Sequence, residues 1–393
     1  MGNYKVTRTF HPVGQGGFYT ERHNDKFNIV YDCGSTPRKH SSSIVQSTFS
    51  KRDDIDILFI SHFDYDHVSS IATLKKNTGT IHAVVMPLLE PEHQALLINL
   101  NRVLSDSILK LISKPESFFD SNTVIYKVRS SNTQEAEDND NPIEIMRSPP
   151  ETMPDGSRYF FRRAPEPILI NSGRLIKLES SNREKNSRQF WTFTPYNYQN
   201  TTRCLNLIQE LKKSGFDTEL LKSDSGYTIN EIATPAKRRA LRKVYNSLNG
   251  TVNENSMLVY SGPSNSEYQL VPCNCSGAEC TSNCNLQPGC IYTGDCDFNK
   301  ITLNQAFGRH INKVGVVQIP HHGSKDSFDI NSLNSVNSSQ SLICPVSYGT
   351  TNRYKHPSRE VINSLILSPK KYRPISITED LNTVFTQSIG LII

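Results

Sequence analysis

The chain has 393 residues, enough for one large domain or two ordinary ones, and a mildly basic net charge of +5. Its hydrophobic fraction of 36% indicates a folded core with long polar insertions and argues against general disorder. No stretch approaches 18 apolar residues, and the first residues lack a charged-then-apolar leader. We therefore expect no secretion signal, no membrane span and a cytoplasmic location.

The first predicted strands, residues 4–10 and 27–32, flank the glycine-rich segment Gly14-Gln15-Gly16. Such a segment permits close backbone approach, although an ordinary hairpin turn explains the same residues. The second strand ends in Asp32-Cys33-Gly34. We expect Asp32 to contact metal or substrate, or to orient a metal-binding histidine from behind.

The densest polar motif follows the apolar run 57–60, which is typical of a buried strand. Within six positions this motif presents His62, Asp64, Asp66 and His67. A short loop leaving a strand can direct such side chains at one point, because neighbours at i, i+2 and i+4 share a face. Imidazole nitrogens combined with carboxylate oxygens are typical of a hydrolytic zinc or manganese site. The alternative is a solvated turn, which has no reason to favour this pattern.

The next elements alternate between helix and strand. Residues 68–76 are predicted as a helix and 81–87 as a strand, in which we interpret His82 as structural. Apolar side chains then recur at helical spacing between residues 92 and 113, namely Leu96, Leu97, Leu100, Val103, Leu104, Ile108 and Leu111. This β-α-β-α order implies a layered α/β architecture.

Residues 105–250 form an elaborated region that departs from this order. A polar, acidic loop is predicted at about 130–157, followed by strands near 168–170 and 190–196 and helices near 201–214 and 235–248. The last helix carries five cations, Lys237, Arg238, Arg239, Arg242 and Lys243. These cations could contact the phosphates of a nucleic acid, although a solvated helix face is the commoner explanation.

Polar clusters in the C-terminal half repeat the pattern of the first motif. Strands are predicted at 256–261, 290–295 and 314–320. Asp295 ends the second of these, and His321 and His322 follow the third, while His356 follows a later turn. Sites in α/β proteins gather at such strand ends, so their shared position favours one common site.

Five of the nine cysteines fall between residues 273 and 290. In a reducing compartment this cluster favours a metal site over a disulfide framework. The candidate ligands of one structural zinc, in an insertion loop at 272–290, are Cys273, Cys275, Cys280 and Cys284. Their spacing differs from that of zinc ribbons, so disulfides or free thiols stay open, and Cys290 is placed in the next strand. Four thiolates leave no open position, so this zinc would not be catalytic.

In combination, these motifs resemble those of the metallo-β-lactamase superfamily, and most of all those of the ComEC-type competence protein hydrolase domain. The segments that carry the resemblance are Gly14–Gly16, Asp32–Gly34, His62–His67, Thr293–Asp295, Pro320–Ser324 and Asn352–Ser358. With that branch the chain shares an aspartate, Asp64, at the middle histidine of His-x-His-x-Asp-His. The resemblance implies a single domain over 1–393, an αββα sandwich of two mixed sheets with outer helices, and a metal site at one sheet edge.

Carried over residue by residue, the resemblance implies two divalent ions, zinc or manganese. The implied ligands are His62 and Asp64 for one ion, Asp66, His67 and either His321 or His322 for the other, and a bridging Asp295. We favour His321 over His322. The superfamily's third metal motif has no clear match, because His93 is the only histidine between residues 83 and 294. The first ion is therefore expected to be loosely held or absent at rest.

The resemblance also implies catalytic roles for three residues. Asp66 or Asp295 would hold the attacking water, and His356 would bind the substrate phosphate or protonate the leaving group. Asp64 makes the first metal position richer in oxygen, which favours manganese or magnesium over zinc.

These observations favour a metal-dependent phosphodiesterase, specifically a nuclease acting on DNA or RNA through a water activated by two metals. One alternative keeps the fold and hydrolyses a cyclic or signalling nucleotide or another small ester. A second is a non-enzymatic regulatory module with protein partners in a multi-component system, which the nearly complete ligand set disfavours. A role in antiviral defence rests on analogy alone.

Overall fold

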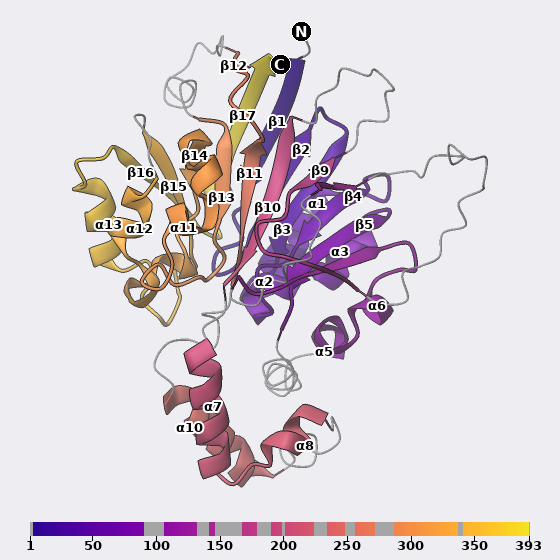
Figure 1. The fold of residues 1–393 in the computed structure, drawn as a ribbon, viewed down its shortest axis with the longest axis vertical. Helices are drawn as coiled ribbons and strands as arrows, with labels where there is room; N and C mark the ends of the chain where they lie inside the picture. The colour runs from indigo at the N-terminus through magenta and orange to yellow at the C-terminus, as the bar shows by residue number, and fades with distance from the viewer. Residues whose placement is uncertain are drawn as a thin grey trace.

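The computed structural model describes residues 3–89, 106–131, 141–145, 167–178, 190–198, 201–223, 234–247, 256–271, 287–336 and 341–392. Two β-sheets pack against each other, and helices cover their outer faces (Figure 1). The predicted α/β class with two mixed sheets and outer helices is therefore confirmed. The face between the sheets is filled by apolar side chains such as Tyr31, Phe59 and Phe193.

The first sheet contains nine strands within the described ranges, in the order β12-β17-β1-β2-β3-β4-β5-β6-β8. Strands β3, β4, β5, β6 and β8 run parallel, whereas β1 pairs antiparallel with β2 and β17. The bounds are β1 Asn3–Phe10, β2 Phe18–His23, β3 Phe27–Cys33, β4 Ile55–Phe59, β5 Ile81–Pro87, β6 Val124–Val128, β8 Ile168–Ile170, β12 Gln269–Leu270 and β17 Phe385–Ile392. The β1–β17 pair places the two ends of the described chain side by side (Figure 1).

The second sheet contains eight described strands, in the order β16-β15-β14-β13-β11-β10-β9-β7. Its bounds are β7 Ile143–Ile145, β9 Ile176–Leu178, β10 Trp191–Asn197, β11 Met257–Pro263, β13 Gly289–Tyr292, β14 Val314–Val317, β15 Leu342–Ser347 and β16 Tyr372–Ile377. Strand β7 corrects the prediction of a polar loop throughout 130–157. Ile143 and Ile145 alternate with Glu144, and Ile145 is buried in the core between the sheets because β7 pairs with β9.

Three groups of helices complete the fold. The first sheet is flanked by α1 (Lys39–Thr48), α2 (Tyr65–Val68), α3 (Ile71–Asn77), α5 (Asp106–Ser113) and α6 (Pro115–Phe118), and the second by α11 (Leu303–Phe307), α12 (Ile330–Asn334) and α13 (Arg359–Ile366). The third group, α7 (Thr201–Lys213), α8 (Thr218–Ser223) and α10 (Pro235–Ser247), projects beyond the sandwich (Figure 1).

These helices account for most of the helical predictions. Helices α7 and α10 confirm the predictions near 201–214 and 235–248. Of the helix predicted over 92–113, residues 106–113 are described as α5, in which Ile108 and Leu111 are buried, and residues 92–105 lie outside the described part. Within the described residues, no helix has the length and apolar character needed to cross a membrane.

A buried ionic network joins the two sheets. Arg8 Nε donates to Glu21 Oε1 at 2.7 Å, and both side chains are fully buried. From the second sheet, Ser261 Oγ and Tyr292 OH donate to the Glu21 carboxylate at 2.6 and 3.0 Å. Burial alone would raise the pKa of Glu21, but Arg8 and His23 hold it at about 2. A buried charge that loses its partner is costly, so this network favours one relative placement of the sheets.

We predict that Glu21→Gln lowers the free energy of unfolding by about 3–5 kcal/mol at pH 7, because it leaves the Arg8 guanidinium buried without its counter-charge. Because the folded-state pKa of Glu21 is depressed, its stabilisation is present above pH 4.5 and is lost as the pH falls towards about 2. Urea unfolding of the variant should therefore show a weaker dependence on pH in this window.

The matched control is an exposed ion pair nearby, between Lys5 of β1 and Asp25 of the β2–β3 turn, at 3.3 Å. Asp25→Asn should change stability by less than about 1 kcal/mol. The double variant Arg8→Met/Glu21→Gln should recover much of the loss, since no buried charge is left unpaired. Equal losses for the buried and the exposed pair would contradict this account.

Candidate metal centre

The first half of the site lies at the end of strand β4. The buried run Ile57–Ile60 leads directly to His62, which is itself buried. Helix α2 begins after Asp64, and its first turn carries Asp66 and His67. The sequence order of apolar strand, loop and short helix thus delivers both histidines and both carboxylates to one edge of the first sheet.

The second half comes from the facing sheet. Asp295 follows β13, and His321 and His322 follow β14 in a short 3₁₀ turn, His321–Gly323. Gly294, between strand and carboxylate, has a positive φ of 54°, and a Cβ there would lie 2.7 Å from Ser61 Oγ. His321 and His322 also have positive φ values of 47° and 56°, which non-glycine residues rarely adopt. Such backbone strain is typical of functional sites.

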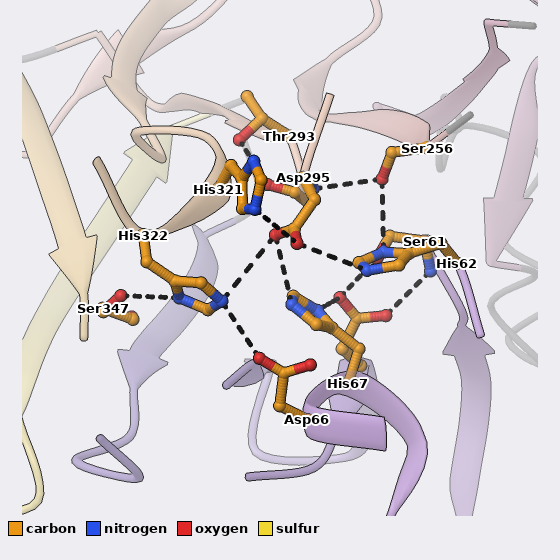
Figure 2. Close-up of polar contacts among 12 residues, drawn as sticks. Ser61, His62, Asp66, His67, Ser256, Thr293, Asp295, His321, His322 and Ser347 are labelled. Carbon is orange, nitrogen blue, oxygen red and sulfur yellow. Dashed lines mark hydrogen bonds and ion pairs between the residues drawn. The ribbon is translucent and has the colours of Figure 1, made fainter. Parts of the chain in front are cut away.

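The Asp295 carboxylate lies between two groups of imidazole nitrogens (Figure 2). Its Oδ2 atom is 3.5 Å from His62 Nε2 and 3.8 Å from His321 Nε2. Its Oδ1 atom is 3.2 Å from His67 Nε2 and 3.9 Å from His322 Nε2. Each carboxylate oxygen therefore faces one histidine from each sheet.

The pair His321 and His322 is placed differently from our expectation. We favoured His321 as the partner of Asp66 and His67, but His322 Nε2 is the atom that lies 3.1 Å from Asp66 Oδ2. Asp66, His67 and His322 offer ligand atoms within 4.8 Å of one another, as do His62, His67 and Asp295. The physical reason is the left-handed backbone of the turn, which directs consecutive side chains to different sides of Asp295. Asp64 belongs to neither of these two groups.

A polar layer behind the histidines fixes their orientation. Asp32 Oδ2 accepts from His67 Nδ1 at 2.9 Å and from Ser61 Oγ at 2.7 Å, while Ser61 N donates to Oδ1 at 2.8 Å. Since the Ser61 hydroxyl hydrogen is directed at Asp32, its oxygen can accept from His62 Nδ1 at 2.9 Å. Nδ1 of both histidines is thereby engaged, and Nε2 faces Asp295. Of the two roles that the sequence left open for Asp32, its contact with His67 Nδ1 favours the orienting one.

The remaining histidines are oriented in the same way. His322 Nδ1 donates to the Ser347 carbonyl at 2.8 Å, and His321 Nδ1 hydrogen-bonds Ser327 Oγ at 2.8 Å. Ser256 Oγ accepts from the backbone N–H of Asp295 at 3.1 Å and lies 3.4 Å from His62 Nδ1. The sequence analysis missed these serines, and only Ser61 had a signal, its position directly before His62.

The electrostatics of the centre suit a bound cation. Burial alone would lower the pKa of His67, yet the carboxylates of Asp295 and Asp32 raise it well above its usual value. Burial likewise opposes ionisation of Asp295, but His67, His321, His62 and His322 hold its pKa well below the usual value. Burial raises the pKa of Asp64 to about 6, although His62 acts in the opposite direction.

Three buried atoms test whether these residues fit a metal. His62 Nε2, His67 Nε2 and Asp295 Oδ1 make no hydrogen bond, although buried polar atoms are normally satisfied. All three belong to the same group of converging donors. Mixed imidazole and carboxylate donors of this kind suit a divalent ion such as zinc or manganese. The described residues therefore fit the metal that the sequence implied.

His356 enters the site from the C-terminal turn. Its ring centroid lies 5.6 Å from that of His321 and 6.5 Å from that of His322. Burial lowers the pKa of His356 to about 4, helped by the charge of these two histidines, so its imidazole is neutral at pH 7. The glycine-rich turn lies close by, because a Cβ at Gly16 would lie 2.5 Å from the Asp66 carbonyl and one at Gly17 2.9 Å from His67 Nδ1.

Other candidate residues lie apart from this centre or outside the described part. Cys273, Cys275, Cys280, Cys284 and His93 fall outside the described residues, while Cys290 is a buried free thiol in β13. On α10, Lys237 Nζ lies over the Phe216 ring at 5.9 Å, and Arg239 and Lys243 are exposed. The side chains of Arg238 and Arg242 are outside the described part. His82 Nε2 lies 3.4 Å from Asp54 Oδ2, away from the centre.

Comparison with known proteins bears on the fold and the motif. Residues 18–125 match the family model described as Metallo-beta-lactamase superfamily, and this range includes the His62–His67 motif. The mixed α/β architecture with two sheets is consistent with that fold. No curated protein matches the chain. A solved structure, the "Crystal structure of a long form RNase Z from yeast", is similar to the chain with a TM-score of 0.36 and 8% identity, over 88% of this chain and 37% of that one.

We predict that Asp32→Asn weakens divalent-metal binding by roughly 10- to 100-fold, because His67 loses the carboxylate that fixes its ring. Metal titration followed by calorimetry measures this change. Asp25→Asn, at an exposed carboxylate in an ion pair with Lys5, is the control and should bind metal normally. Unchanged metal affinity in a folded Asp32→Asn protein would refute the positioning role.

Proposed function

We propose that this protein is a metal-dependent phosphodiesterase, specifically a nuclease acting on DNA or RNA. The observation that supports the proposal most directly is the Asp295 carboxylate, whose two oxygens each face a histidine from either sheet. The alignment of two donor groups about one carboxylate is suited to a pair of divalent ions sharing a bridging ligand. The metallo-β-lactamase match over residues 18–125 agrees with a hydrolase.

The proposed ligands follow from these distances. One ion would be held by His62, His321 and Asp295 Oδ2. Asp64, two residues after His62 in the sequence, is the proposed further ligand of this ion. The second ion would be held by Asp66, His67, His322 and Asp295 Oδ1. Zinc or manganese bound here would activate a water molecule and neutralise charge that develops on a phosphoryl group. In this proposal Asp295 would serve both ions, the role that the resemblance to the metallo-β-lactamase superfamily implies for it.

The chain's own side chains have distinct tasks in this proposal. Burial would raise the pKa of Asp66, but the hydrogen bond from His322 and the charge of His67 hold it at about 2. Asp66 is therefore ionised at neutral pH and can accept a hydrogen bond from an attacking water. Neutral His356 carries one N–H, which can donate to a phosphate oxygen of the substrate. The proximity of the His356 ring to those of His321 and His322 supports this role.

The choice of a nucleic-acid substrate rests on charge and on the motif branch. The chain is mildly basic, and Arg239 and Lys243 are exposed on α10, in the helical group that projects beyond the sandwich (Figure 1). The aspartate at position 64 and the Pro-His-His-Gly-Ser segment support a ComEC-type hydrolase, a branch that processes DNA. A cytoplasmic location is part of the same proposal.

We predict that the purified chain cleaves labelled DNA or RNA oligonucleotides when manganese is added. The variant His62→Ala/Asp66→Ala should lose activity by roughly 100-fold or more, because metal stabilisation of the reaction is worth several kcal/mol. His82→Ala, at a histidine outside the centre, should retain activity. Absence of cleavage, or equal cleavage by wild type and the double variant, would overturn the proposal. Small phosphodiesters in parallel assays distinguish a signalling-nucleotide phosphodiesterase.

We predict that Asp64→His shifts the metal preference towards zinc. The substitution replaces an oxygen donor by an imidazole nitrogen, and softer donors favour zinc over manganese. Elemental analysis after equilibration with both metals, together with activity in each metal, gives the measurement. Asp53→His, at a carboxylate hydrogen-bonded to Ser50 on the surface, is the control. An unchanged zinc-to-manganese ratio in the Asp64→His protein would exclude a ligand role for this residue.

A further inference from the structure

Tyr354 is an exposed aromatic side chain beside the metal centre. It is 72% exposed, whereas large aromatic side chains usually bury much of their surface. Its ring stacks near that of His356, with the centroids 5.7 Å apart and 28° between the ring planes. His356 lies in turn 5.6 Å from His321, which faces Asp295. A series of ring contacts therefore leads from the centre to solvent.

The loop that carries Tyr354 has a one-sided charge. Residues 349–358 include two cations, Arg353 and Lys355, and no acidic residue. Both cations are exposed and directly flank Tyr354 in the sequence. Cations next to an exposed aromatic ring are the combination that proteins use to hold phosphates and to stack bases of a nucleic-acid strand.

Hydrogen bonds fix the shape of this loop. The Asn352 side chain donates to the carbonyls of Gly349 and His356, each at 2.6 Å, and accepts from the His356 backbone N–H at 2.9 Å. Glu379 accepts from the backbone N–H and the hydroxyl of Thr350. The Ser358 backbone N–H donates to the carbonyl of Gly323, in the turn that holds His321 and His322. Tyr354 thus sits on a loop that is braced internally by Asn352 and is tied at its C-terminal end to the turn of the metal centre.

We propose that Tyr354 stacks on an unpaired nucleobase next to the scissile phosphate, so that the protein acts on single-stranded nucleic acid. The inference rests on the proposed function, because it names the class of phosphodiester that the centre receives. A base in a duplex has both faces covered by its neighbours, whereas an unpaired base can offer one face to an aromatic ring. Arg353 and Lys355 supply contacts to the flanking phosphates.

We call Tyr354, with its proposed stacking contact to a base, the platform. Binding measured without cleavage tests the platform separately from catalysis. Fluorescence anisotropy in EDTA measures the Kd for a labelled single-stranded DNA, the matching RNA and a duplex of the same sequence. Tyr354→Ala should weaken single-strand binding by roughly 5- to 150-fold, the range that stacking on one base provides. Tyr354→Phe keeps the ring and should restore binding. Leu381→Ala, at a side chain that is 70% exposed on a different turn, is the control for loss of an exposed apolar group.

Two further readouts separate stacking from general attraction. An oligonucleotide with an abasic residue at the stacked position should bind wild type and Tyr354→Ala equally, because it has no base on which Tyr354 could stack. Tyr354→Ala should leave the salt dependence of binding unchanged, whereas Arg353→Ala should reduce its slope. A Tyr354→Ala effect that persists on abasic substrates at every position would overturn the platform.

Cleavage assays with manganese complete the test. Suppose that single-strand binding depends on Tyr354 but that the protein cleaves no oligonucleotide with any added metal. This result would support the platform and overturn the proposed nuclease. Cleavage with the same Kd for wild type and Tyr354→Ala, or tighter binding of the duplex, would overturn the platform and leave the nuclease standing. Neither binding nor cleavage of any oligonucleotide would overturn both.

Discussion

The Asp295 carboxylate is the constraint on which the rest of the site depends. It is 3% exposed, and a carboxylate removed from water is unfavourable unless positive charge compensates it. His67 and His62 come from the first sheet, and His321 and His322 from the second, so compensation requires both sheets to end at the same place. The sandwich is therefore coupled to the site, because a shift of one sheet would separate the carboxylate from half of its partners.

Two buried polar networks join the sheets, and they differ in a way that separates structure from function. In the Arg8–Glu21 network each charged group has several partners, including Gln387 on β17 and Tyr292 on β13. At the metal centre, by contrast, three buried atoms have no hydrogen bond. A network that is satisfied by its own members favours one fold, whereas converging unsatisfied donors need a ligand. The hydrogen bonds of the first network are therefore complete within the protein, whereas the atoms of the second could hold a metal ion.

The sequence was most informative where buried strands lead into polar residues. The run 57–60, followed by His62–His67, predicted both strand β4 and one half of the centre, because apolar runs and strand ends are local properties. The choice between His321 and His322 was not predictable, since it depends on positive φ values at both residues, which no spacing rule encodes. Strand β7 was hidden in a polar segment because three residues gain their stability from β9. Ser256 contributes through folding alone, from a position 194 residues beyond His62.

The hydrogen bonds behind the histidines also affect the free-energy cost of binding a metal. Asp32, Ser61, the Ser347 carbonyl and Ser327 engage Nδ1 of the four imidazoles, so that Nε2 is directed inwards by the protein alone. A site organised in this way loses little conformational entropy on binding, because the rings are already oriented. Asp64 differs from the inner donors, since burial raises its pKa to about 6 and so weakens its negative charge near neutral pH. A cation beside Asp64 would stabilise its ionised carboxylate. Metal binding beside His62 and Asp64 should therefore be coupled to loss of the Asp64 carboxyl proton.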